Sequence, residues 1–131
     1  KLAEGSITGT PGKTITFRQY FTPDGKYILQ SGADRGYLID AETLKAVDEI
    51  TDINGDNHDI MPTPDGKYAV MTLREKVKDE AGKEIVDGTI QLYDIEARKV
   101  LGKSVSVCAS CHDDVGLYVP ATLCGVDGNW N

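Results

Sequence analysis

Two cysteines and a histidine in the C-terminal part of the chain have the spacing of a covalent haem attachment site. Residues 108–112 read CASCH, so two residues separate Cys108 from Cys111 and His112 follows directly. Two thiols at this spacing can form thioethers with the two vinyl groups along one edge of a porphyrin, and the next histidine then lies under the iron. The spacing predicts one covalent haem c, held by Cys108 and Cys111, with His112 as an axial iron ligand.

A disulfide or a zinc ion would be another use of these thiols. The chain has three cysteines and two histidines, and an odd number of cysteines makes a poor disulfide framework. Zinc prefers four ligands, and only His58 and Cys124 remain to complete such a site. A chance C-x-x-C-H has odds on the order of one in a thousand in such a chain. Haem is therefore favoured, and we expect Cys124 to be a thiol in the core.

The sequence leaves the sixth coordination position of the iron open. His58 is the one other histidine of the chain and is our candidate for the second axial ligand. Met61 and Met71 are weaker candidates, and thioether ligation by either would raise the reduction potential. An external ligand could also take this position, or the iron could stay open, and His58 would then have no role at the metal.

Composition and charge limit the classes of protein and partner. The 131 residues are 40% hydrophobic and 7% aromatic, which suits one domain with a modest core and argues against disorder. The 21 acidic and 14 basic residues give a net charge of −7, which argues against nucleic acid and anionic membranes as partners. No run of about 18 apolar residues predicts a membrane span. Residues 1–5 lack the apolar core of a signal peptide, so a secreted protein is expected here in its mature form.

Two motifs recur in the same order along the chain. The sequence FTPDGKY at residues 21–27 recurs as PTPDGKY at residues 62–68, and their matching prolines are 64 − 23 = 41 residues apart. The sequence DAETLK at residues 40–45 recurs as DIEARK at residues 94–99, which gives 94 − 40 = 54. The second copy thus contains an insertion, which falls within the charged residues 74–87. We expect this insertion to form an exposed hairpin centred on its Ala-Gly pair.

Each copy of the repeat is predicted to be β. The Pro-Asp-Gly sequence is typical of a tight turn, because proline presets φ and glycine accepts a positive φ. The strands that we expect are 27–29, 37–40 and 46–50 in the first copy and 68–71, 90–94 and 99–105 in the second. No window shows helical spacing. Four short strands in about 41 residues are the signature of a propeller blade, so we predict an all-β fold of propeller-like blades with four antiparallel strands each.

A third copy of the repeat begins near the C-terminus. The His-Asp pair at residues 58–59 recurs at residues 112–113, 54 residues later, and VDGNW at residues 126–130 matches PDGKY at residues 64–68. The predicted organisation is an N-terminal leader or strand at 1–13, repeat 1 at 14–50, repeat 2 at 51–107 with a hairpin insertion at 74–87, and a haem-attachment segment with a partial repeat 3 at 108–131. Propellers close with about 4–8 blades. We therefore expect the chain to assemble with copies of itself or another propeller subunit, or to belong to a longer protein.

Two further motifs look like ligand-binding loops without fitting them. Residues 9–14 read GTPGKT, but Ile7 stands where a phosphate-binding loop has its first glycine, and a strand rather than a helix is expected to follow. Residues 52–57 read DINGDN, but Asn57 replaces the glycine and Thr63 the final glutamate of a calcium loop. Neither motif predicts a site.

Both the repeat and the CASCH motif resemble known families. Over residues 14–107 the repeat resembles the YVTN-type propeller repeat, and the blades of the cytochrome cd1 nitrite reductase propeller are similar. The CASCH motif resembles the attachment site of c-type cytochromes. That resemblance implies a periplasmic or extracellular location, because haem is attached covalently on the outer side of the bacterial cytoplasmic membrane.

The resemblance implies electron transport as the function. A c-type cytochrome passes single electrons by Fe(III)/Fe(II) cycling and requires a redox partner protein. One alternative is a fragment or subunit of a propeller haem oxidoreductase, similar to the cytochrome cd1 group, with an open iron site for a small nitrogenous substrate. Another is an interaction scaffold without haem, in which CASCH is coincidental.

Overall fold

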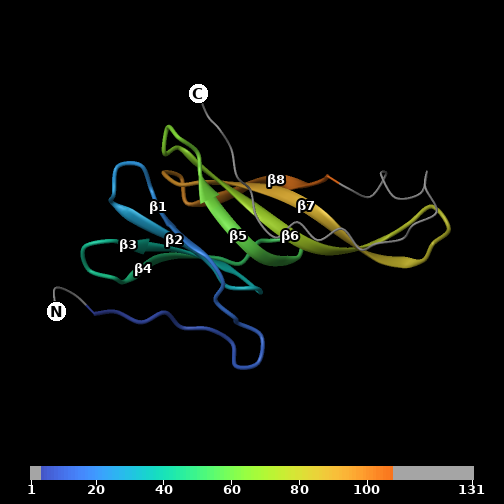
Figure 1. Ribbon diagram of the computed structural model, residues 1–131, viewed down its shortest axis with the longest axis horizontal. Coiled ribbons are helices and arrows are strands. Elements are labelled where there is room, and N and C mark those ends of the chain that lie inside the picture. The colour runs from blue at the N-terminus through green and yellow to red at the C-terminus, as the bar shows by residue number, and fades with distance from the viewer. Residues whose placement is uncertain (1–3, 108–131) are drawn as a thin grey trace.

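The computed structural model of the chain describes residues 4–107. These residues contain eight β-strands and no helix, and the strands form two four-stranded antiparallel sheets (Figure 1). The prediction of an all-β fold with two sets of four antiparallel strands is confirmed. Residues 108–131, on which the haem-attachment segment and the partial third repeat were predicted, lie outside the described residues.

Sheet 1 consists of the four strands of the first repeat. They are β1 (Gln19–Phe21), β2 (Tyr27–Ser31), β3 (Gly36–Asp40) and β4 (Ala46–Ile50), and they pair in chain order. Sheet 2 consists of β5 (Asp56–Pro62), β6 (Tyr68–Lys78), β7 (Glu84–Asp94) and β8 (Lys99–Ser106), also paired in chain order. Both sheets are therefore meanders, in which each strand turns back beside the strand before it.

The turn before the second strand is built in the same way in both sheets. In sheet 1 the Thr22 hydroxyl donates to the Asp24 carboxylate at 2.6 Å, and in sheet 2 Thr63 donates to Asp65 at the same distance. These threonine hydrogen bonds are the main cause of the lowered pKa of both carboxyl groups. In sheet 1 the next residue, Gly25, has a φ of 71°, which lies in the left-handed region that glycine tolerates. The repeated TPDGKY sequence thus encodes one turn twice.

The turn before the fourth strand is also repeated, although its sequence differs. The carboxylates of Asp40 and Asp94 accept backbone N–H bonds from Thr43 at 2.7 Å and from Ala97 at 2.8 Å. Each turn then places a residue other than glycine in the left-handed region, with φ values of 55° for Leu44 and 53° for Arg98. These two residues are 98 − 44 = 54 residues apart, which is the offset of the DAETLK and DIEARK motifs.

The core lies between the two sheets. Leu29 and Leu38 of sheet 1 are fully buried in one cluster with Ile60, Met71 and Tyr93 of sheet 2. Because side chains alternate between the two faces of a strand, one face of each sheet supplies this core. The phenol of Tyr93 also donates to the Asp48 carboxylate of sheet 1 at 2.6 Å, which joins the sheets by a hydrogen bond.

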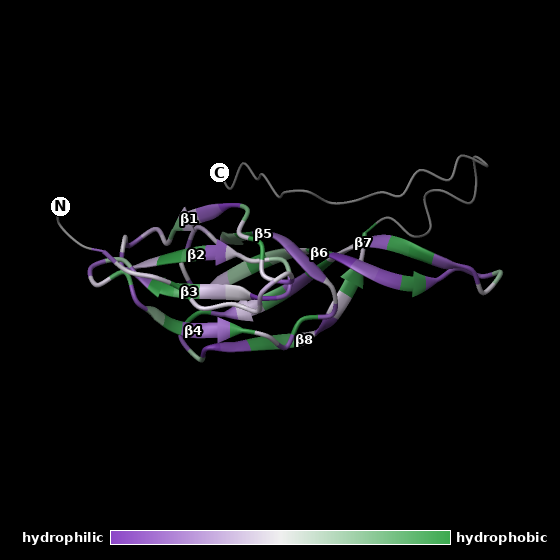
Figure 2. Cartoon of the chain, turned by 90° about the horizontal axis from the view of Figure 1, so that it is seen from below, coloured by the Kyte–Doolittle hydropathy of each residue, from purple (hydrophilic) through white to green (hydrophobic). Residues whose placement is uncertain are grey.

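Residues 74–87 lengthen the hairpin of β6 and β7. The two strands stay in register from Arg74 opposite Gly88 to Lys78 opposite Glu84, where a turn closes the hairpin. Gly82 lies in that turn with a φ of 79°. Figures 1 and 2 show that the hairpin projects beyond the rest of sheet 2.

Two leucines at equivalent positions of the repeat test the placement of the core. Leu38 has no exposed surface, whereas Leu92, 54 residues later, is 40% exposed. We expect Leu38→Ala to lower the free energy of unfolding by about 2–5 kcal/mol, because it leaves a cavity between the sheets. Leu92 lies on the other face of sheet 2, so Leu92→Ala reports on that face and not on this core. Urea unfolding measures both, and a loss below about 1 kcal/mol in Leu38→Ala would contradict the described core.

Candidate functional site

The structure describes three of the predicted iron-site residues. Cys108, Cys111 and His112 lie outside the described residues, as does Cys124. The candidates for the second axial ligand, which are His58, Met61 and Met71, lie on β5 and β6 of sheet 2. The surroundings of these three residues therefore define the candidate site within residues 4–107.

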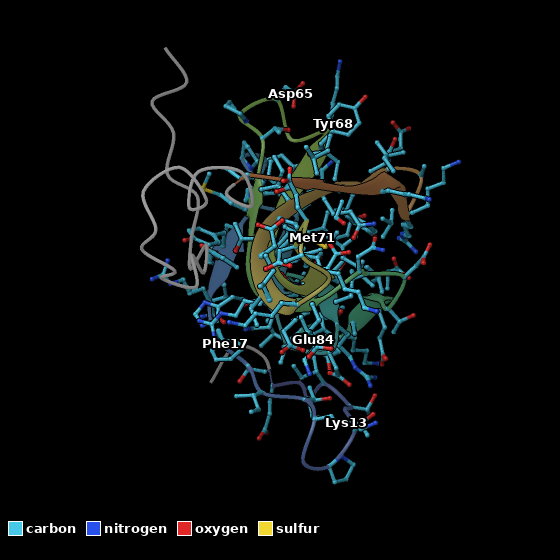
Figure 3. All side chains as sticks on the ribbon, turned by 90° about the vertical axis from the view of Figure 1, so that its right-hand side faces the viewer. Lys13, Phe17, Asp65, Tyr68, Met71 and Glu84 are labelled. Carbon is cyan, nitrogen blue, oxygen red and sulfur yellow. The ribbon has the colours of Figure 1, made fainter. Side chains whose placement is uncertain are left out.

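Met71 has a packing role. It is fully buried, pairs with Ile60 across β5 and β6, and belongs to the core between the sheets. Figure 3 shows it in the interior of the molecule. If the Met71 sulfur were an iron ligand, the porphyrin would have to enter the core, where the side chains of both sheets are packed.

Met61 points to the opposite face of sheet 2. It is one residue after Ile60 on β5 and pairs with Val70. Because neighbouring residues on a strand alternate between faces, Met61 lies on the face that sheet 1 does not cover. It is partly exposed there. The structure thus does not bring the two methionines together.

His58 is the extra residue of a β-bulge. Asn57 pairs with Leu73 and Asp59 with Thr72, so the register of β5 and β6 shifts at His58. A bulge changes the direction of a side chain and often occurs beside a functional site. Here the imidazole ring stacks on the ring of Phe17, with centroids 4.3 Å apart and an angle of 27° between the planes.

The partner of His58 occupies the equivalent position in the first repeat. Phe17 and His58 are 58 − 17 = 41 residues apart, which is the offset between the two TPDGKY motifs. The next two residues, Arg18 and Asp59, are also 41 residues apart, and they form an ion pair at 3.4 Å. Equivalent positions near the first strand of each repeat are therefore in direct contact.

Asp59 connects the two repeats beside this stack. Its carboxylate is 1% exposed and accepts from the Arg18 guanidinium, from the Tyr20 hydroxyl at 3.3 Å and from the Ile60 backbone N–H at 3.0 Å. A buried carboxylate requires such donors to offset the loss of its hydration. The three donors come from both sheets, so Asp59 fixes β5 against β1.

The backbone around His58 is also held by sheet 1. Asn57 and Ala33 exchange two backbone hydrogen bonds, at 2.6 and 3.1 Å, and the Ser31 hydroxyl donates to the carbonyl oxygen of His58 at 3.1 Å. These bonds join the inner end of β5 to the end of β2. The position of His58 is therefore set by main-chain contacts as well as by its ring.

Phe17 and His58 line a pocket of about 360 Å³. Ile15 adds a second exposed apolar side chain, while Lys13 and Arg74 add positive charge. In Figure 3, Phe17 and Lys13 both lie in the lower part of the molecule as drawn. The pocket combines an apolar wall, an imidazole and cationic groups.

Acidic groups form another part of the pocket wall. Asp34 and Asp56 both line it. The Arg35 guanidinium donates to Asp34 at 2.9 Å, and this bond is the main cause of the lowered pKa of the Asp34 carboxyl group. The Thr14 hydroxyl also donates to Asp34 at 2.8 Å. These bonds hold Asp34 as a carboxylate that is already paired.

Val107, the residue before Cys108, lies in the same cross-strand row as Asp56, the first residue of β5. The Val107 backbone N–H donates to Gly88 at 3.0 Å, Gly88 pairs with Arg74, and Arg74 pairs with Asp56. This row crosses all four strands of sheet 2. With about 4.8 Å between strands, it spans about 14 Å from β8 to β5.

Sequence reasoning identified His58 but not the residues around it. Phe17, Arg18 and Asp59 were not among the predicted site residues. Their signal was present in the sequence, because the 41-residue offset relates Phe17 to His58 and Arg18 to Asp59. Within residues 4–107, no group of three or more His, Cys, Asp or Glu side chains is placed to hold a metal ion. That part of the chain also has no helix of the length and hydrophobicity that crossing a bilayer requires.

Comparison with known proteins finds a similarity in fold. No model of a protein family and no curated protein sequence matches the chain. Among solved structures, a crystal structure of the eukaryotic initiation factor is similar, with a TM-score of 0.55 and 15% sequence identity. The match covers 80% of this chain and 24% of that one, so the chain spans about a quarter of the length of that structure. At this identity the likeness concerns the fold alone.

The ion pair at the inner strands provides a test of this junction. Arg18→Ala removes a donor from the buried Asp59 carboxylate, so we expect a loss of about 1–3 kcal/mol in the free energy of unfolding. Lys26→Ala is the control, because the Lys26–Asp24 pair is 4.0 Å long and exposed on both sides. That variant should change the stability by less than about 0.5 kcal/mol. Urea unfolding of both variants measures the difference, and an equally small loss in both would argue against the junction.

Proposed function

We propose that the protein is a c-type cytochrome that carries single electrons. Cys108 and Cys111 hold one haem c by thioethers, and His112 is an axial ligand of its iron. The four-stranded units serve as a propeller-like scaffold, and the protein acts in the periplasm or outside the cell with a redox partner protein. The CASCH motif supports the cofactor, and the repeated sheets support the scaffold.

The contact between Phe17 and His58 is the observation that carries the proposal for the second ligand. It joins equivalent inner positions of repeats 1 and 2, with ring centroids 4.3 Å apart. His112 stands at the next equivalent position, since 112 − 58 = 54 is the second offset of the repeat. If successive repeats again place these positions side by side, His112 lies near His58. The two imidazoles would then be available to hold one iron, with their rings farther apart than in the Phe17–His58 stack.

The reach of the chain is compatible with this arrangement. Val107 lies in the row of sheet 2 that ends at Asp56 on β5. Five residue steps separate Val107 from His112, and an extended chain spans about 3.3–3.6 Å per residue. The resulting reach of about 17 Å exceeds the 14 Å or so between β8 and β5.

The described residues suit an amphipathic cofactor. Ile15 and Phe17 offer apolar surface, and Lys13 and Arg74 offer positive charge near carboxylate groups. The main-chain bonds of Asn57 and the Ser31 hydroxyl fix the backbone on which His58 stands. The haem supplies Fe(III)/Fe(II) cycling, and the protein supplies fixed ligands that need little rearrangement between the two oxidation states. If His58 and His112 both held the iron, no position would remain for a substrate, which favours a carrier over an enzyme.

Covalent attachment is tested by the mass of the intact chain. When the chain is produced in the periplasm of a host with a cytochrome c maturation system, we expect its mass to rise by one haem. Cys108→Ala together with Cys111→Ala should abolish the increase, because neither thioether can form. Cys124→Ala is the matched control and should keep it. An unmodified mass of the original chain would rule out a c-type cytochrome and leave the scaffold interpretation.

The second axial ligand is tested by substitution of His58. In the haem-loaded protein, His58→Ala should convert the iron from six-coordinate low spin to a form that binds cyanide, whereas Met61→Ala should leave the absorption spectrum unchanged. His58→Met should restore six-coordination and raise the reduction potential. Ready cyanide binding by the original protein would instead favour an open site, as the oxidoreductase alternative requires.

A further inference from the structure

Sheet 2 has a row of apolar side chains on the face that sheet 1 does not cover. Met61, Val70, Leu92 and Leu101 stand directly opposite one another across β5, β6, β7 and β8. Leu92 is 40% exposed, and the other three are partly exposed. We call these four residues the outer row. An apolar row across a whole sheet is a typical surface for a partner.

The equivalent row of sheet 1 is covered by sheet 2. The 41-residue offset relates Met61 to Tyr20 and Val70 to Leu29, and the 54-residue offset relates Leu92 to Leu38. Tyr20, Leu29 and Leu38 also stand opposite one another. Leu29 and Leu38 have no exposed surface, because they pack on the core residues of sheet 2. The repeat therefore places the outer row where a following sheet would cover it.

We propose that the outer row is the docking surface of a third sheet, whose first strand is residues 110–116 of this chain. Residues 110–116 are the positions equivalent to β5 (Asp56–Pro62) in the next repeat, 54 residues later. In the described part of the chain, β5 packs against both β1 and β2, the inner strands of the preceding sheet. Residues 110–116 accordingly cross β5 and β6, over Met61 and Val70. Docking of this strand does not require haem, although it uses the same repeat offset as the proposed function.

A second copy of the chain is the main competing occupant. Sheet 1 has its own apolar row on its outer side, which consists of Phe21, Ile28, Ile39 and Ala46. Phe21 in that row is 64% exposed. Sheet 1 of one copy could approach the outer row of another. Residues 110–116 of the same chain are favoured as the occupant, because Val107 lies three residues before them. Val107 is in the same cross-strand row as Asp56, the first residue of β5.

Photo-cross-linking of the full chain identifies the occupant. Benzoylphenylalanine in place of Val70 should form an intramolecular product, and peptide mass spectrometry should map it to residues 110–116. The same probe in place of Ile28 is the matched control, because Ile28 is the apolar β2 residue of the other row, and it should give no product with that segment. A cross-linked dimer through residues 21–46 would assign the surface to a second copy. The absence of any protein product at Val70 would show an open face, and both results would overturn the proposal.

The two methionines provide a second measurement that needs no substitution. With dilute hydrogen peroxide, Met61 should be oxidised as slowly as the fully buried Met71, a rate ratio near one, if a strand covers the outer row. Fast oxidation of Met61 alone would overturn the proposal. Both experiments are carried out on the haem-free chain as well as the haem-loaded chain. A chain that binds no haem but still forms the cross-link would show that the proposed function is wrong and that the docking surface is right.

Discussion

The packing of one sheet on the next is the constraint on which the rest of the structure depends. Leu29 and Leu38 are buried by the residues of sheet 2, and a single repeat cannot bury its hydrophobic face alone. Asp59 sets the lateral position of this packing, since its buried carboxylate must meet Arg18 and Tyr20 of the preceding repeat. The position of His58 follows directly, because it is the neighbour of Asp59 on the same bulged strand.

Much of the fold could be predicted from the sequence, because it is encoded locally and twice. The TPDGKY turns indicated where the second strand of each sheet begins, and both turns are stabilised by hydrogen bonds of the same kind. The strand lengths were predicted less well. Strands expected at 68–71 and 90–94 extend to Tyr68–Lys78 and Glu84–Asp94, because the charged insertion continues the pairing of the hairpin. Charged side chains weakened the β pattern of the sequence there, but an exposed hairpin tolerates them.

The candidate site depends on contacts that no local pattern reveals. His58 was predicted because histidine is rare in this chain, and the contact of its ring with Phe17 arises only when the two sheets pack. The bulge at His58 has no clear sequence signal either, since it reflects the fit between β5 and β6. Met71 is the reverse case. It was predicted as a candidate iron ligand, and the structure buries it with Ala69 and Leu73 on the core face of β6, which continues beyond the strand expected at 68–71.

The turns that contain Leu44 and Arg98 show that the repeat is maintained in the backbone even where the side chains differ. Each of these residues adopts a left-handed conformation that costs about 1–2 kcal/mol for a residue other than glycine. Such turns persist only where the surrounding structure determines them, as the Asp40 and Asp94 carboxylates do here. The conformational cost grows in proportion to the number of units, so each added sheet must gain more from its contact with the preceding sheet than its own turn costs. An array of such units is therefore stable only when its sheet-to-sheet contacts are well packed at every step.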